Sequence, residues 1–168
     1  HLKREPKAKI VYMTCEQFTN EFIDAIQNNS LTKFRNKYRR ADYLLVDDIH
    51  FLAGKEKSQE EFFHTFNMIS DGRRQIVLTS DRPPAEISDL EERIVSRCEW
   101  GLTAGLELPD LETRLAILRK KMSMWQVTLE DRMVEFLADR IRKSVRRLEG
   151  AMMRLASYSA LSGKSLTD

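Results

Sequence analysis

Two adjacent aspartates carry the clearest chemical signal in the chain. Asp47 and Asp48 directly follow the apolar run at residues 43–46 (YLLV), which predicts a buried strand that ends in two carboxylates. In open parallel sheets, ligands collect outside the carboxyl ends of the strands. One carboxylate there can hold Mg²⁺, and the other can orient or deprotonate a water. The alternative is that the two aspartates only end the strand and begin a turn.

A second polar strand end lies at residues 79–81 (TSD). Residues 75–79 (QIVLT) predict a further buried strand, and parallel pairing would bring Thr79, Ser80 and Asp81 beside the two acids. A polar group at that position can place a water or contact a phosphate. The alternative is a turn cap before Arg82 and the two prolines that follow it.

Two arginines follow on a short predicted helix. Arg93 and Arg97 are four residues apart, so they lie on one face. A guanidinium fork fits phosphate oxygens and neutralises the charge that develops in phosphoryl transfer. The alternative is a solvated face paired with neighbouring glutamates. Arg146 and Arg147, at the start of the last predicted helix, allow the same two interpretations.

Other familiar motifs are weak or missing. The segment Gly163-Lys164-Ser165 matches only the tail of a phosphate-binding loop, because Tyr158 stands where a glycine is required and a helix precedes it. Gly163 is instead predicted to cap that helix. A metal centre that joins His50 to the two acids is a weaker hypothesis. Cys15 and Cys98 have neither disulfide nor metal-motif spacing, which favours a reducing, cytoplasmic setting.

The periodicity of apolar residues predicts two parts. Buried strands at 10–13, 43–48 and 75–79 alternate with helices at 15–27, from 31 and at 55–71. This alternation indicates an α/β fold with a parallel sheet and right-handed crossovers. Thr14 is predicted to cap the first helix in a capping box with Gln17, and Gly72 to end the third in a left-handed conformation. Beyond a short helix through Arg97, only helices follow, so we expect domains at 1–108 and 109–168.

Composition excludes several classes of protein. With 28 Lys plus Arg against 26 Asp plus Glu, the net charge is only +2, so a wholly electrostatic nucleic-acid binder is not expected. A hydrophobic share of 42% can fill a core. No apolar run is long enough for a membrane span. The chain opens at His1 without an apolar signal segment, and we expect it to be a piece of a longer protein.

Three stretches of sequence resemble one known family. Residues 44–51 (LLVDDIHF), 58–67 (SQEEFFHTFN) and 78–82 (LTSDR) are similar to the DnaA family of bacterial chromosomal replication initiators. Residues 93–97, 100–102 (WGL) and 148–150 (LEG) continue the match in family order. The resemblance implies a P-loop NTPase (AAA+) parallel sheet flanked by helices, truncated at its N-terminus, followed by an all-α lid subdomain.

The resemblance also implies roles for the residues of the two strand ends and the short helix. Asp47 and Asp48 correspond to the Walker B acids, which serve Mg²⁺ binding and water activation. Asp81 corresponds to the sensor on the neighbouring strand. Arg97 corresponds to the arginine finger offered to ATP on the next protomer, and Arg93 to its companion arginine.

Further roles concern nucleotide and DNA. Arg146 corresponds to the lid arginine that faces the γ-phosphate, whereas Ile23, Lys55 and Lys57 correspond to positions that grip single-stranded DNA. The resemblance implies a parent protein that binds ATP or ADP with Mg²⁺, assembles head to tail on origin DNA and promotes strand opening. A replicative helicase or its loader is a further implied partner. Since the family's glycine-rich loop would precede His1, this chain alone is expected to bind no nucleotide.

Two alternatives stay open. One is the initiator-related regulator that stimulates ATP hydrolysis by the initiator on the sliding clamp. The other is a nucleotide-free interaction module, which would bind single strands or a protein partner through Lys55, Lys57 and the basic helix around residues 35–40.

Overall fold

The computed structural model describes residues 7–162, so the predicted cap Gly163 lies outside the described residues. The chain divides into two compact units, His1–Thr103 and Ala104–Asp168. Residues 102–110 have no regular secondary structure, and the expected domain boundary after Leu108 falls inside that stretch. Among the described helices, none combines the length and the apolar character that crossing a membrane requires.

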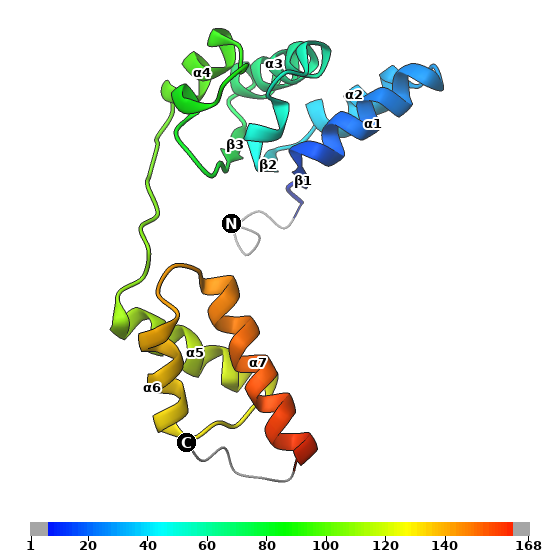
Figure 1. The fold of residues 1–168 in the computed structure, drawn as a ribbon. Helices are drawn as coiled ribbons and strands as arrows, with labels where there is room; N and C mark the ends of the chain where they lie inside the picture. The colour runs from blue at the N-terminus through cyan, green and yellow to red at the C-terminus, as the bar shows by residue number, and fades with distance from the viewer. Residues whose placement is uncertain (1–6, 163–168) are drawn as a thin grey trace. The chain divides into compact units, whose positions relative to one another are not determined.

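The first unit alternates strands and helices around a parallel sheet (Figure 1). Its strand order is β1-β2-β3, with Thr14 opposite Asp47 and Val46 opposite Leu78. The elements are β1 (Ile10–Thr14), α1 (Cys15–Gln27), α2 (Leu31–Arg39), β2 (Tyr43–Asp47), η1 (Ile49–Leu52), α3 (Glu56–Asp71), β3 (Gln75–Leu78), η2 (Pro84–Glu86) and α4 (Glu92–Glu99). The predicted α/β fold with a parallel sheet is confirmed.

The start of α1 shows how the sequence sets a boundary. The hydroxyl of Thr14 accepts a hydrogen bond from the Gln17 backbone N–H at 3.1 Å, which satisfies one of the free donors at the helix start. The Gln17 side chain bonds Glu21 instead of returning to Thr14. Only the first half of the predicted capping box therefore forms.

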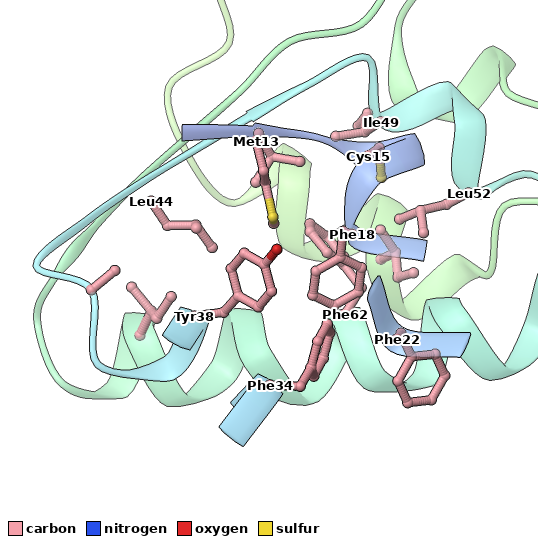
Figure 2. Close-up of a cluster of buried hydrophobic side chains, with 14 of the residues drawn as sticks. Met13, Cys15, Phe18, Phe22, Phe34, Tyr38, Leu44, Ile49, Leu52 and Phe62 are labelled. Atoms are coloured by element: carbon pink, nitrogen blue, oxygen red, sulfur yellow. The ribbon is translucent and has the colours of Figure 1, made fainter. Parts of the chain in front are cut away.

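Aromatic side chains fill the space between the sheet and the helices α1, α2 and α3. Figure 2 shows Phe18 of α1 among the rings of Phe34, Tyr38 and Phe62, with Met13 reaching in from β1. The ring centroids of these three lie 5.1, 5.3 and 5.7 Å from that of Phe18, in the range where tilted and edge-on aromatic pairs attract. This core fixes the sheet relative to the three helices.

The prediction of fully buried strands is wrong for one face of the sheet. Met13, Leu44 and Val46 are buried against the helices, whereas Tyr12 is 64% exposed and Val77 is 52% exposed on the alternate positions. The strands follow one another in chain order across the sheet, so right-handed crossovers place all their helices on one side. Apolar residues alone do not reveal which of two faces is covered.

The prediction for Gly72 is also wrong. Its φ is −74°, and Arg73 takes the left-handed conformation with φ 53°. A Cβ at position 72 would lie 2.7 Å from Nε of Arg74, so a larger residue there would require the Arg74 side chain to shift. The Arg74 guanidinium passes there to donate hydrogen bonds to the carbonyl oxygens of Arg39 and Met68, at 2.7 and 3.0 Å.

The second unit is helical, with α5 (Leu111–Trp125), α6 (Asp131–Arg140) and α7 (Val145–Ser162) (Figure 1). Its core gathers apolar side chains from all three helices and the loop before α6: Leu118, Leu129, Val134, Leu137, Ala138, Leu148 and Met152. The buried Arg114 donates to the carbonyl oxygens of Ala138 and Pro109, at 2.6 and 2.7 Å. That side chain ties α6 to the segment that enters the unit.

Candidate functional site

The carboxyl ends of β2 and β3 meet at one threonine. The Thr79 hydroxyl accepts the Asp48 backbone N–H at 3.0 Å and donates to Oδ1 of Asp47. The Thr79 N–H donates to the carbonyl oxygen of Val46 at 3.0 Å, and its own carbonyl accepts from Ile49 at 2.9 Å. We call Asp47, Asp48 and Thr79 the strand-end junction. It brings together two acids and a hydroxyl from neighbouring strands, as the sequence predicts.

The backbone turns sharply at the junction. Asp48 has φ 59° and ψ 58°, a left-handed conformation that few residues other than glycine adopt and that aspartate tolerates better than most. It ends β2 and starts η1, and the Thr79 hydroxyl holds its amide in this position. Such backbone conformations persist where the surroundings fix them, and they cluster at functional sites.

Tyr12 of β1 completes the surroundings of Asp47. Its hydroxyl donates to Oδ2 of Asp47 at 3.1 Å, so each oxygen of the Asp47 carboxylate accepts a hydrogen bond from a hydroxyl group. This hydrogen bond, together with the negative charge of the carboxylate, raises the pKa of Tyr12 above its usual value. The contact depends on the register between β1 and β2, which places Thr14 opposite Asp47.

The junction fits one class of metal ion. Within residues 7–162 there is no group of three His, Cys, Asp or Glu side chains arranged to hold a metal. Two carboxylates with nearby hydroxyls are hard oxygen donors. They suit Mg²⁺, which keeps several waters and commonly takes its other ligands from phosphates.

Asp81, the predicted sensor, lies three residues past the end of β3. Its carboxylate accepts two hydrogen bonds from Arg82, at 2.9 and 3.0 Å. These bonds and the charge of Arg82 lower the pKa of Asp81 below its ordinary value. Nδ1 of His50 in η1 lies 3.3 Å from the same carboxylate, so Asp81 faces the turn that follows the two acids.

Arg93 and Arg97 lie on the same face of α4, as their spacing predicts. Their guanidinium carbons are 4.9 and 6.0 Å from the ring centroid of Phe63 on α3, a distance at which a cation and an aromatic ring attract. Arg93 also pairs with Glu91. Arg97 contacts the Trp100 ring at 6.0 Å and has no carboxylate partner among residues 7–162. Arg97 is partly exposed, and its charge is not used in an ion pair among these residues.

The predicted DNA-contacting residues lie around the start of α3 and on α1. Lys55 precedes α3, and its Nζ is 5.9 Å from the ring centroid of Phe51. Lys57 is exposed on the first turn of α3. Ile23 is an exposed apolar side chain on α1, a helix that packs against η1. Two cations and two exposed apolar side chains, Ile23 and Phe51, thus belong to adjoining elements.

Three of the basic side chains of α2 are held in ion pairs with neighbouring helices. Arg35 and Arg39 both bind Glu61 of α3, at 2.8 and 2.6 Å. Lys37 pairs with Glu21 of α1 at 2.7 Å. Only Lys33 and Arg40 are left without a carboxylate partner within the described part of the chain. The charge run that the sequence offers as an interaction surface is thus mostly internal ion pairing.

Arg146, the predicted lid arginine, belongs to the second unit. It is exposed on the first turn of α7. The Ser144 hydroxyl accepts the backbone N–H of the next residue, Arg147, at 3.2 Å, which caps the start of that helix.

Comparison with known proteins identifies the family. A model of the bacterial DnaA ATPase domain matches residues 1–105. The chain belongs to this family. Its first unit is therefore the α/β part of a DnaA AAA+ domain, and its second unit contains the helices that follow that part.

Solved structures agree with this assignment. Domain III of the DnaA replication initiation protein from Thermotoga maritima is 40% identical with a TM-score of 0.95, and the match covers 99% of this chain and 70% of that one. AMPPCP-bound DnaA from Aquifex aeolicus is 32% identical with a TM-score of 0.82, covering 96% of this chain and 49% of that one. A replication initiator DnaA bound to AMPPCP and single-stranded DNA is 31% identical with a TM-score of 0.81, covering 95% and 50%.

The chain spans about half the length of the two nucleotide-bound DnaA chains. Its match to the DnaA family reaches from the first strand through the strand-end junction and α4. No pattern in the sequence of this DnaA domain gives Tyr12 or Gln59 a functional role. Phe63, at a position where the sequence favours a core residue, is partly buried against the core of the first unit. It lies four residues after Gln59, which places the two on one face of α3.

Replacing Thr79 with valine tests the junction. Thr79→Val removes the acceptor for the Asp48 amide and the donor to Asp47 while keeping the shape of the side chain. We expect a loss of about 1 kcal/mol in the free energy of unfolding, the usual contribution of such hydrogen bonds at a partly exposed site. Thr79→Ser keeps the hydroxyl and serves as the control. Equal urea midpoints for the two variants would show that the hydroxyl does not hold the junction.

Proposed function

We propose that this DnaA domain acts in a replication initiator that binds ATP or ADP with Mg²⁺ at the strand-end junction. The DnaA relatives bound to AMPPCP support this assignment. So does the geometry, because the junction lies at the carboxyl edge of a parallel sheet, where such folds bind their ligands. A single charge distribution carries the proposal: acids gather at this edge, while Lys55, Lys57 and Arg97 have no carboxylate partner among the described residues.

The residues of the junction would divide the work. Asp47 would hold Mg²⁺, directly or through water, while Tyr12 and Thr79 keep its two oxygens oriented. Asp48 would orient or deprotonate the attacking water. Asp81 would sense the nucleotide from the neighbouring strand, and Arg146 would bind the γ-phosphate. The magnesium ion, when bound, supplies charge neutralisation at the phosphates.

Arg97 and Arg93 would act on a second protomer. An arginine without an internal carboxylate partner can complete a phosphate site on a neighbouring molecule. Because the donating helix and the receiving junction are different surfaces, the contact is heterologous and repeats head to tail. ATP would then control the assembly of a filament, and hydrolysis would reset it.

The filament would hold single-stranded origin DNA through Ile23, Lys55 and Lys57. Lysines can follow the phosphate backbone, and exposed apolar side chains can pack against bases. A DnaA relative bound to single-stranded DNA supports this role. In this proposal the protein works in the cytoplasm, promotes strand opening at the origin, and meets a replicative helicase or its loader there.

The two lysines give a direct test of DNA binding. In the double variant Lys55→Ala, Lys57→Ala, the affinity for a single-stranded oligothymidylate should fall about tenfold. The slope of log affinity against log salt should become shallower by about 1.4, since each phosphate contact on a single strand contributes about 0.7. Fluorescence anisotropy over a salt series measures both quantities.

The matched control is the double variant Lys33→Ala, Arg40→Ala on α2. It removes the same charge from side chains that also lack a carboxylate partner in residues 7–162, so it should leave affinity within about twofold. If this control weakened binding and the lysine variant did not, the DNA contact would lie at α2 and the assignment of Lys55 and Lys57 would be wrong.

A further inference from the structure

Gln59 is a buried amide that bonds to three separate backbone groups. It lies on the first turn of α3 and is 1% exposed. Its Nε2 donates to the carbonyl oxygens of Leu52 and Asp89, at 3.0 and 2.8 Å. Its Oε1 accepts the backbone N–H of Glu91 at 2.7 Å. One side chain therefore joins the end of η1 to the loop that leads into α4.

The carbonyl of Asp89 receives a second hydrogen bond. The N–H of Gly54 donates to it at 3.1 Å. Gly54 has φ 70°, a conformation that glycine adopts without strain, and it immediately precedes Lys55. The carbonyl oxygen of Asp89, in the loop at 88–91, thus accepts hydrogen bonds both from the loop at 53–55 and from the Gln59 side chain.

The same face of α3 also supports the arginines. Phe63 lies one helical turn after Gln59, so the two side chains lie on one face. Phe63 contacts the guanidinium groups of Arg93 and Arg97, while Gln59 holds the residue that caps their helix, Glu91. Ile94, nearly fully buried, anchors α4 to the core. The position of α4 therefore depends on α3 at its start and along its arginine face.

We propose that Gln59 is a positioning residue that couples the Lys55 loop to the arginine helix α4. This inference rests on the proposed function, in which Lys55 contacts single-stranded DNA and Arg97 contacts nucleotide on the next protomer. Moving either loop breaks hydrogen bonds to groups that are shielded from water, which is costly. A ligand that orders the Lys55 loop should then also stabilise the loop that leads into α4. By thermodynamic linkage, a ligand that orders the second loop should stabilise the first to the same extent.

Hydrogen exchange on this chain tests the coupling without nucleotide. A single-stranded oligothymidylate should slow exchange at residues 53–57. In the wild type it should also slow exchange at 91–95, where the amides of Glu91, Ile94 and Val95 are hydrogen-bonded. Any bound ligand stabilises the whole fold, and the change in exchange at Leu44 and Val46 in β2 measures this general effect. That change is subtracted from the protection observed at 91–95.

Gln59→Met keeps an unbranched side chain of similar length and removes all three hydrogen bonds. We expect protection at 53–57 to remain and the transmitted protection at 91–95 to fall at least threefold. Gln59→Asn, which is too short to span the two loops, should behave alike and is the variant to use if Gln59→Met does not fold. Thr65→Val is the control, since Thr65 is buried on the same helix and its hydroxyl has no hydrogen-bond partner among residues 7–162.

The outcomes separate the two ideas. If the oligonucleotide leaves 53–57 unprotected, the proposed DNA contact is wrong and the coupling falls with it. If 53–57 is protected in the wild type and 91–95 is not, the coupling alone is wrong. Transmitted protection that survives in both Gln59 variants would also overturn it, because another contact would carry the effect.

Discussion

Glu61→Ala is expected to lower the free energy of unfolding by about 3 kcal/mol. The Glu61 side chain is 4% exposed and accepts hydrogen bonds from Arg35 at 2.8 Å and from Arg39 at 2.6 Å. Removing one member of a buried ion pair leaves the other charges uncompensated and costs about 3–5 kcal/mol. The lower end applies here because both arginines are partly exposed and can turn toward water. Urea unfolding followed by circular dichroism measures the loss.

Glu60→Ala is the matched control on the same helix. The Glu60 side chain is 61% exposed and has only His64 nearby, at 4.0 Å. An exposed pair of this kind contributes little, so the control should stay within about 0.5 kcal/mol of the wild type. Equal losses for the two variants would mean that Glu61 does not join α2 to α3 through its ion pairs.

The pH dependence gives a second readout of the same pair. Burial alone would raise the pKa of Glu61, but the hydrogen bonds and charges of Arg35 and Arg39 outweigh it and lower the pKa. A carboxyl whose folded pKa lies below its unfolded value stabilises the protein above about pH 4.3. That contribution is lost as the pH falls through the folded value. As the pH falls below about 4.3, the free energy of unfolding should therefore decrease more steeply for the wild type than for Glu61→Gln.

Much of the architecture can be predicted from local patterns. The helix after Thr14 begins at a cap and repeats phenylalanines at helical spacing, and the structure begins α1 at Cys15. The run at 43–46 ends in two acids, and β2 ends at Asp47. The boundaries of these elements depend on residues that are close together in the chain, so they can be predicted from the sequence alone.

Contacts between strands cannot be predicted in this way. The sequence places several polar residues after β3, but the register decides that Thr79 bonds to both acids. Tyr12 reaches Asp47 across 35 positions of sequence. A shift of one residue in either pairing would turn these side chains to the opposite face. The exposed second face of the sheet has the same origin, because only the path of the crossovers determines which face the helices cover.

Charge runs mislead for a related reason. Residues 35–40 form a basic run in the sequence, yet Glu61, 26 positions after Arg35, pairs with both Arg35 and Arg39. Lys55, Lys57 and Arg97 are fewer and more scattered in sequence, yet they have no carboxylate partner in residues 7–162. Only the packing of α2 on α3 distinguishes the two groups. Charge density along the sequence therefore does not show which cations are left without a carboxylate partner.

Arg97→Ala should abolish most ATP-dependent assembly while leaving the fold and nucleotide affinity intact. The Arg97 guanidinium lies near the rings of Phe63 and Trp100, each at 6.0 Å, and has no carboxylate partner among residues 7–162, so its loss should change the free energy of unfolding by less than about 1 kcal/mol. In a chain extended to the length of the DnaA relatives, ATP affinity should stay within about twofold. Assembly on single-stranded DNA should weaken at least tenfold, or about 1.4 kcal/mol per contact, because the arginine acts on the nucleotide of the next protomer.

Two further variants make this prediction specific to the guanidinium. Glu92→Ala removes an exposed charge from the first turn of the same helix and should assemble like the wild type. Arg97→Lys keeps the charge but loses the planar fork, so it should fall between alanine and arginine. Sedimentation with ATP and with ADP distinguishes the three. Unchanged ATP-dependent assembly in Arg97→Ala would show that Arg97 does not act on the nucleotide of the next protomer.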